Sequence, residues 1–265
     1  MSAQYRITPS LLNKFQDLLD ADRHWEEFYG NSDEPSISSE DYYAKCEQEL
    51  LDTINRIPFV SEAASRGTAL NEIVDCILER RKQRPDMKVE RVYEQPGENG
   101  DVMALRAELD NFSFLFDINL VNQLTDYFFG ATCQYRCEAT MDTRYGPVIL
   151  YGDVDYIMMD IVYDLKSTSK YSSYGKFCDG WQKDLYPWAL IESGDMQTVS
   201  GFEYTIVPLT GGTATSPLIT GEIKKEWYDY SHGASTNRLR GILEAFIPWI
   251  EEHREQITHK RIFNQ

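Results

Sequence analysis

The chain has 265 residues, of which 42% are hydrophobic, and its 43 acidic and 26 basic side chains give a net charge of −17. This length and composition predict a full hydrophobic core, and the acidic balance argues against a protein that coats nucleic acid through clustered cations. An enzyme with a local basic channel, or with an acidic cluster that draws DNA through a divalent ion, is compatible with that charge.

The sequence predicts a cytoplasmic protein with no membrane partner. The opening segment MSAQYRITPS has no apolar signal region, and no stretch approaches the roughly 18 consecutive apolar residues of a membrane span. The five cysteines are odd in number and scattered, which favours a reducing compartment over a disulfide framework. No second Cys or His pair follows Cys133 and Cys137 at zinc-site spacing, so these are expected to be ordinary core thiols.

Helical spacing of apolar residues predicts three helices in the first part of the chain. The first follows the N-cap candidates Thr8 and Ser10 and extends to about Phe28, where the polar segment GNSDEPSISS ends it. The second and third helices are expected over residues 39–56 and 61–83.

The middle of the chain changes to strand-like alternation. Residues 88–94 and 101–106 are expected to be strands on either side of the turn QPGENG, and residues 114–129 a helix under the sheet. Three antiparallel strands are then expected over 134–141, 148–158 and 161–166.

The last part of the chain adds both kinds of element. A helix is expected over 175–192, two strands over 199–208 and 218–224 around the loop TGGTATS, and an amphipathic helix over 236–255. Pro187 is expected to kink or restart the first of these helices.

This order of elements predicts an α/β (α+β) fold in which helices flank a mixed central sheet. We expect a single domain over residues 1–265. Its expected parts are an N-terminal helical part (1–85), a sheet core (86–225) and a C-terminal helical part (226–265).

The segment GDVDYIMMDIVYDLKST places acids and a lysine inside an otherwise apolar hairpin. If a two-residue turn follows Met158, Asp155 lies opposite Asp164 and Asp153 lies opposite Lys166. Because side chains alternate along a strand, these four residues then project from one face and the apolar residues from the other.

Two carboxylates that face each other across strands repel unless a cation neutralises them. Hard oxygen ligands select magnesium, manganese or calcium, and Lys166 beside them can orient a water or stabilise charge on a phosphate. The alternative is a solvated outer face that carries ordinary charges. A register slip of one residue would instead turn the aspartates toward the apolar side.

Asp155, followed by Asp164-Leu165-Lys166, resembles the core motif of the PD-(D/E)xK nuclease superfamily. GDVD and YDLKST are similar to the G-x-x-D and D-x-K-T/S strands of its RecB-like and Cas4-like branch, and QKDLY, from Gln182 to Tyr186, is similar to its Q-x-x-x-Y helix. Upstream, RITPSLLNKFQDLL and RGTALNEIV resemble two further helices of that branch, in the family's order.

The resemblance implies a restriction-endonuclease-like core and a metal-dependent DNA nuclease of the exonuclease kind. Such an enzyme would hydrolyse phosphodiester bonds in DNA recombination, repair, phage replication or defence, with DNA and a recombination or replication protein as partners. Asp155 and Asp164 would coordinate Mg²⁺ or Mn²⁺, Lys166 would position the attacking water, and Gln182 with Tyr186 would hold the lysine and the phosphate.

The sequence departs from the family at two places. Asn71 stands where the branch commonly has a metal-binding His, and Glu72 and Asp75 are candidates to supply oxygen ligands instead, which favours magnesium. The iron–sulfur cysteines of Cas4-like proteins have no counterparts, so no cluster is expected. The alternative reading is a catalytically weakened nuclease-fold protein that acts as a partner or inhibitor in a nucleic-acid complex. A nuclease directed at RNA is a third reading.

Three lysines flank the Q-x-x-x-Y helix and are candidates to contact a nucleic-acid backbone. They are Lys170, Lys176 and Lys183. For each of them the alternative is a position on a solvated helix face.

Overall fold

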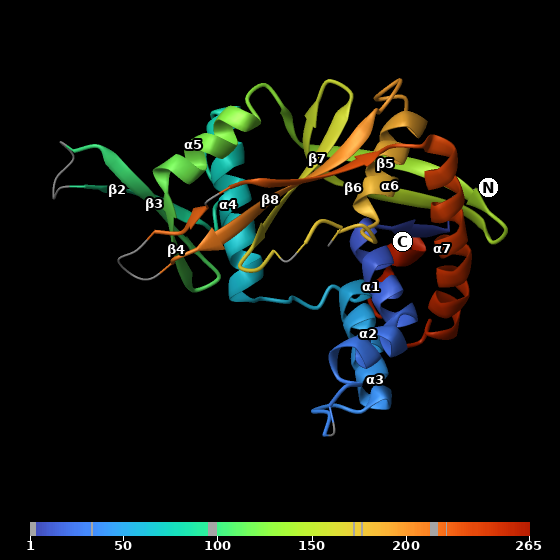
Figure 1. Cartoon of the computed structure of the whole chain (residues 1–265). Coiled ribbons are helices and arrows are strands. Elements are labelled where there is room, and N and C mark those ends of the chain that lie inside the picture. The colour runs from blue at the N-terminus through green and yellow to red at the C-terminus, as the bar shows by residue number, and fades with distance from the viewer. Residues whose placement is uncertain are drawn as a thin grey trace.

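A computed structural model describes the chain over residues 4–32, 34–94, 100–171, 173–175, 177–212, 217–220 and 222–265. These residues form a mixed α/β fold, which confirms the fold class expected from the sequence. A seven-stranded mixed sheet lies at the centre and a three-stranded antiparallel sheet at one end, with helices beside them (Figure 1). None of the helices in these ranges combines the length and the apolar composition needed to span a membrane.

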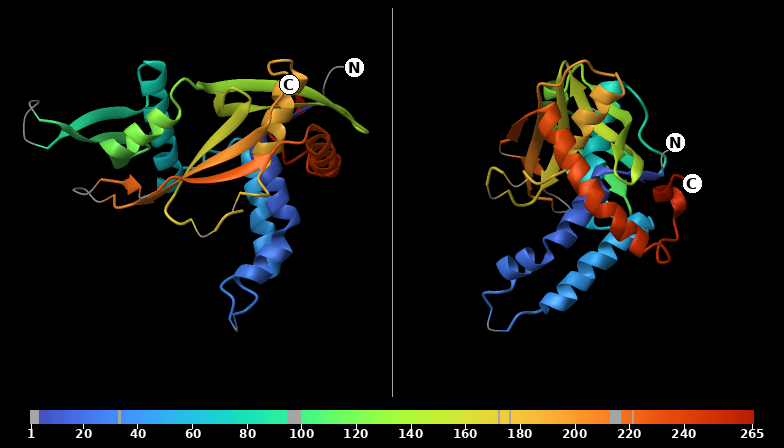
Figure 2. Two further views of the ribbon diagram at one scale, coloured as in Figure 1. Left: turned by 45° about the horizontal axis from the view of Figure 1, so that its top comes forward. Right: turned by 90° about the vertical axis from the view of Figure 1, so that its right-hand side faces the viewer.

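The N-terminal elements are β1 (Tyr5–Ile7), α1 (Pro9–Leu19), α2 (Ala21–Phe28) and α3 (Ser39–Ile54). Helices α2 and α3 extend away from the sheet (Figure 2). The Thr8 hydroxyl caps α1 by accepting the backbone N–H of Leu11. The single helix expected up to Phe28 is in fact two helices, because the backbone leaves helical geometry at Asp20, with ψ of 8°.

The next elements are α4 (Glu62–Glu79), β2 (Lys88–Tyr93), β3 (Val102–Leu109), β4 (Phe112–Asp117) and α5 (Ile118–Tyr127). The helix expected over 114–129 is wrong in its first part, which is strand β4. Asp110 and Asn111 have positive φ angles of 52° and 66°, and they form a two-residue turn that pairs Leu109 with Phe112. This turn makes β3 and β4 a hairpin.

The later strands are β5 (Thr132–Thr143), β6 (Gly146–Met158), β7 (Ile161–Thr168), β8 (Gly201–Thr210), β9 (Ile219–Thr220) and β10 (Lys224–Asp229). The order in the large sheet is β1-β6-β7-β8-β10, with β5 paired to β6 and β9 paired to β8. Strands β5, β6 and β7 are antiparallel, as expected, whereas β7 and β8 run parallel. The strand expected over 218–224 is only the short β9, and the next strand begins at Lys224.

The remaining helices are α6 (Gln182–Glu192), α7 (His232–Glu252) and the 3-10 turn η1 (Lys260–Phe263). The helix expected over 175–192 begins only at Gln182, and the restart expected at Pro187 is wrong because α6 runs through it. Pro187 lies near the start of α6, where it removes a single backbone hydrogen bond to the carbonyl of Lys183. The turns expected at QPGENG and TGGTATS lie partly outside the described residues.

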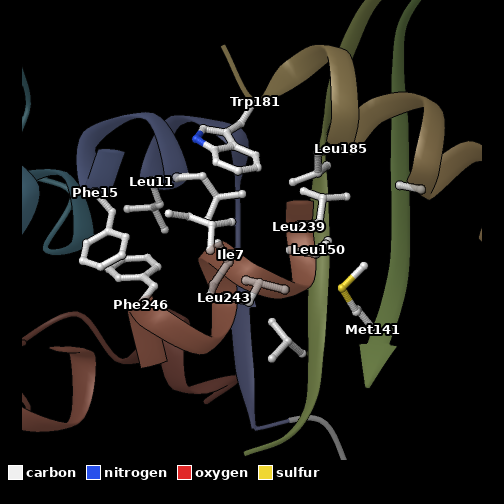
Figure 3. Close-up of a cluster of buried hydrophobic side chains, with 14 of the residues drawn as sticks. Ile7, Leu11, Phe15, Met141, Leu150, Trp181, Leu185, Leu239, Leu243 and Phe246 are labelled. Carbon is white, nitrogen blue, oxygen red and sulfur yellow. The ribbon is translucent and has the colours of Figure 1, made fainter. Parts of the chain in front are cut away.

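Two hydrophobic cores lie against the large sheet. The first lies between α1, α6, α7 and the sheet, where Phe15 stacks on Phe246 with ring centroids 4.5 Å apart (Figure 3). The second lies under α4 and α5. Strand β7 supplies Val162 to the first core and Tyr163 and Leu165 to the second. Each large apolar side chain contributes about 1.5–3 kcal/mol on burial, so β7 is fixed from both of its faces.

Candidate active site where β6 and β7 diverge

The β6–β7 hairpin has the register expected from the sequence. Tyr156 pairs with Tyr163 and Met158 with Ile161, across a two-residue turn in which Met159 has a φ of 51°. Regular pairing ends at Tyr156 and Tyr163, one step before the two acids would face each other. The strands diverge from this point onward.

The side chain of Asp155 reaches across the opening between the strands. Its Oδ2 accepts a hydrogen bond of 2.9 Å from the backbone N–H of Leu165. This N–H has no partner from regular pairing with β6, so the carboxylate satisfies it instead. Burial, and then the charge of Asp164, raise the pKa of Asp155 to about 7, against the opposing effects of Lys166 and the Leu165 N–H. The two carboxylates therefore share one site, in which the charge of Asp164 disfavours the ionised form of Asp155.

Asp164 is buried, with an exposed fraction of 3%, so the solvated outer face is ruled out for this residue. The Nζ of Lys166 lies 2.7 Å from its Oδ2, and the Nε2 of Gln182 lies 3.4 Å from its Oδ1. Burial lowers the pKa of Lys166, but the charges of Asp164 and Asp155 outweigh that effect and leave the pKa raised. Lys166 is consequently a cation at neutral pH.

Helix α6 brings Gln182 and Tyr186 to the same place, one helical turn apart. Tyr186 is nearly buried and lies against Gly152 of β6, where an added Cβ would stand 2.5 Å from its Cε1. Burial, followed by the charges of Asp164 and Asp155, raises the pKa of Tyr186. Because Gln182 touches β7 and Tyr186 touches β6, α6 bridges the two diverging strands.

One face of helix α4 lies over the site. Gly67 packs against Ser167 at the end of β7, and the charge of Asp75 adds to the raised pKa of Asp155. Asn71 lies one turn from each of them, so it belongs to the same helix face. The Oδ1 of Asn71 is buried and has no hydrogen-bond partner within the described residues. This oxygen is therefore available to a ligand.

Two acids that the sequence associates with the site are engaged elsewhere. Glu72 accepts the Nη1 and Nη2 of Arg81 over 2.7 and 2.9 Å, and it also accepts the backbone N–H of Arg84. Both oxygens of Glu72 thus accept hydrogen bonds from Arg81 or Arg84, and its role as a metal ligand stays a prediction. Asp153 does not face Lys166 either; it is exposed and forms an ion pair of 3.1 Å with Arg136 on β5.

The three lysines proposed to contact nucleic acid differ in their surroundings. Lys183 is nearly buried and its Nζ lies 2.9 Å from Asp184, which also pairs with Arg238, so its contact with nucleic acid stays a prediction. Lys170 is exposed just beyond β7, and its role stays a prediction. Lys176 lies outside the described residues.

Two residues of the site were missed in the sequence. Asn13 of α1 accepts the backbone N–H of Trp181 over 2.9 Å and donates to Gln182, while the hydroxyl of Tyr204 on β8 donates to Gln182 over 3.3 Å. Tyr204 lies in the strand sequence GFEYTIVPLT, where nothing distinguishes it from an ordinary core aromatic residue. Asn13 gives no signal either, because it lies outside the apolar stripe of α1, where polar residues are expected.

The site opens into a cleft of about 400 Å³ whose wall includes Lys166, Gln182 and Tyr204. Across the cleft lie side chains of α1 and α2, among them Asn13 and Asp17. The ammonium group of Lys166, whose side chain is 31% exposed, is the charged group of the site that reaches this cleft.

The site offers too few protein ligands to enclose a metal ion completely, but its oxygen atoms suit magnesium. No three His, Cys, Asp or Glu side chains converge as a metal site in the described part of the chain. Asp155, Asp164 and the unpaired amide oxygen of Asn71 form a sparser set, made only of oxygen. Mg²⁺ is commonly bound by one or two carboxylates, with waters and substrate phosphates completing its octahedron. Asp155, Asp164 and Asn71 are thus the residues that could hold Mg²⁺ or Mn²⁺.

Comparison with known proteins adds little to this geometry. No family model matches the sequence, and no curated protein matches it. A solved structure titled "Crystal structure of SSO0001" aligns with 92% of this chain and 78% of its own, at 9% identity and a TM-score of 0.39. A likeness this weak carries no argument about function.

Proposed function

We propose that the protein is a metal-dependent nuclease that hydrolyses phosphodiester bonds in DNA. The observation that carries this proposal is the shared site of Asp155 and the buried Asp164, with the ammonium group of Lys166 2.7 Å from Asp164. A pair of acids and a lysine in a cleft can bind a divalent ion and act on a phosphate next to it.

The carboxylates would be the metal ligands. Asp155 and Asp164 would hold Mg²⁺ or Mn²⁺, with Asn71 as a further oxygen donor. The bound ion would polarise a phosphoryl oxygen and lower the pKa of a bound water. The hydrogen bond from Leu165 fixes Asp155, and that from Gln182 fixes Asp164, so both acids are oriented before any ligand arrives.

Lys166 would act on the reacting phosphate. Its ammonium group is cationic and reaches the cleft, so it can orient the attacking water and stabilise the negative charge that develops on the phosphate. Gln182 is held from two sides by Asn13 and Tyr204. This support keeps Gln182 beside Asp164 and Lys166.

We further propose that the nuclease is an exonuclease that works in DNA recombination, repair, phage replication or defence. Its partners would be DNA and a recombination or replication protein. The order and spacing of the motifs around Asp155, Asp164-Leu165-Lys166 and Gln182 to Tyr186 support this part of the proposal.

The proposal is tested by incubating the purified protein with linear DNA and magnesium. We expect the wild type to degrade DNA and Lys166→Ala to be slower by about 100-fold or more, the usual loss when one group that stabilises transition-state charge is removed. Lys45→Ala, on the exposed side of α3, is the matched control and should retain full activity. An inactive wild type, or equal activity in Lys166→Ala, would contradict the proposal.

A second candidate function is a nuclease-fold protein with little activity that serves as a partner or inhibitor in a nucleic-acid complex. Asp17, Asp20 and Asp179 line the cleft and repel phosphates, which favours this reading. Calorimetric titration with magnesium and manganese separates the two functions. Binding at millimolar concentration or tighter supports the nuclease, and its absence supports the partner. The same degradation assay with RNA tests the third reading.

A further inference from the structure

Four arginines from separate elements gather around Tyr151 of β6. The guanidinium carbons of Arg136, Arg6 and Arg261 lie 4.4, 4.8 and 5.2 Å from the centre of its ring. Arg56, which follows α3, lines the same hollows as Tyr151 and Arg261. The chain has a net charge of −17, so this local cluster of positive charge is opposite in sign to the protein as a whole.

The acids of the protein neutralise only part of this charge. Arg6 is paired with Glu138, and Arg136 is paired with Asp153. Arg56 and Arg261 form no ion pair with any other residue that the structure describes. Stacking on an aromatic ring offsets some of the repulsion between guanidinium groups, and a bound anion would offset the rest.

Arg56, Arg136 and Arg261 line a hollow of about 400 Å³, which we call the arginine pocket. Thr8 and Ser10 at the start of α1 also line it, so hydroxyl groups and the positive end of a helix join the guanidinium groups. Planar guanidinium groups bind phosphate oxygens through paired hydrogen bonds, and a phosphate is the anion that this mixture of donors suits best.

The arginine pocket adjoins the candidate active site. Tyr186 of α6 and Gly152 of β6, which pack against each other beside the two acids, form part of its wall. Helix α1 connects the two places, since Ser10 lines the pocket and Asn13 contacts Gln182. At 1.5 Å of rise per residue, these two α1 positions lie about 5 Å apart along the helix axis.

We propose that the arginine pocket binds a phosphate group of the nucleic-acid strand whose scissile bond lies at Asp155 and Asp164. This inference rests on the proposed function. The phosphate is either the terminal monoester of the strand or an internal diester. Both have negatively charged oxygen atoms that can pair with Arg56 and Arg261.

The test measures binding without cleavage, in EDTA and at low salt. A fluorescent single-stranded DNA of twelve nucleotides is titrated with the wild type, Arg56→Gln, Arg261→Gln and the double variant, and anisotropy is recorded. We expect each single change to raise Kd by about tenfold, the effect of losing one charge-assisted hydrogen bond, and to reduce the salt dependence of Kd. Arg91→Gln, on the exposed β2 strand of the small sheet, is the matched control and should bind like the wild type.

Oligonucleotides with and without a 5′-phosphate identify the source of the phosphate. A larger loss of affinity for the phosphorylated strand assigns the pocket to the terminal group, and equal losses assign it to an internal diester. Wild-type affinity in Arg56→Gln and in the double variant, or no binding by the wild type, would overturn the inference. Because the binding assay contains no metal, its result does not depend on cleavage. If these changes weaken binding but the wild type never cuts DNA in the degradation assay, the arginine pocket is supported and the nuclease proposal is refuted.

Discussion

The carboxylate of Asp155 and the backbone N–H of Leu165 are joined by a hydrogen bond of 2.9 Å between two strands that have stopped pairing. The acid thus has a structural task in addition to its proposed chemical one. The two tasks can be separated, because an amide oxygen can accept the same hydrogen bond without carrying the charge.

Asp155→Ala should lower the free energy of unfolding by about 1–3 kcal/mol, since it leaves the Leu165 N–H buried without a partner. Asp155→Asn keeps an acceptor and removes the repulsion from Asp164, so its stability at neutral pH should equal or exceed that of the wild type. Urea unfolding followed by circular dichroism measures both. Equal losses in the two variants would show that the hydrogen bond contributes little.

The stability of the protein should fall as pH rises through the range in which Asp155 titrates. Burial and the Asp164 charge raise the pKa of Asp155 to about 7, whereas an unfolded Asp titrates near about 3.9. Between these values the folded state binds the extra proton, so this contribution is complete at low pH and is lost as the pH passes about 7.

Urea unfolding of the wild type and Asp155→Asn at about pH 5 and about pH 8, without metal, isolates this effect. Asp75, whose pKa burial raises to about 6, titrates in both proteins and largely cancels in the difference. The free energy of unfolding of the wild type minus that of the variant should be lower at the higher pH. A difference that stays constant with pH would mean that Asp155 is ionised normally.

Gly152→Ala should destabilise the protein by about 1–3 kcal/mol, the usual effect of forcing an extra carbon into a packed interior. The new Cβ would stand 2.5 Å from Cε1 of Tyr186, which is nearly buried and cannot move away freely. Adding Tyr186→Ala should reduce the further loss caused by Gly152→Ala, because the clash is then gone. Gly241→Ala, where an added Cβ meets nothing within 4 Å, is the control and should be neutral or stabilising.

Asn71→Ala should weaken magnesium binding by about tenfold, in the range seen when a supporting group of a metal site is lost. Its Oδ1 has no partner within the described residues, so its removal should change the free energy of unfolding little in the absence of metal. Calorimetric titration and urea unfolding of the same preparation give both values. Unchanged magnesium affinity would place Asn71 outside the metal site.

The sequence predicted the hairpin well because its information is local. Alternating side chains and a two-residue turn fix a register, and that register sets Asp155 and Asp164 on facing strands. The divergence of the strands was not predictable in this way. Where the strands diverge, α6 contacts Gly152 of β6 and Asp164 of β7, and these contacts join segments far apart in the chain.

The error over 114–129 has a different origin. The run FSFLFD has enough apolar residues for either a buried helix or a strand, and the deciding signal was the Asp110–Asn111 turn before it. The arginine pocket gave no signal at all, because Arg56, Arg136 and Arg261 come from distant parts of the sequence.

Residues 162–165 of strand β7 are buried, and a core packs on each face of the strand there. Its amide protons should therefore be among the slowest in the molecule to exchange with deuterium, and Asp164 and Lys166 would be carried on one of its least mobile segments. Any adjustment to an incoming strand would then fall to the cleft wall formed by α1 and α2, while the acids keep their positions through each cycle of binding and release.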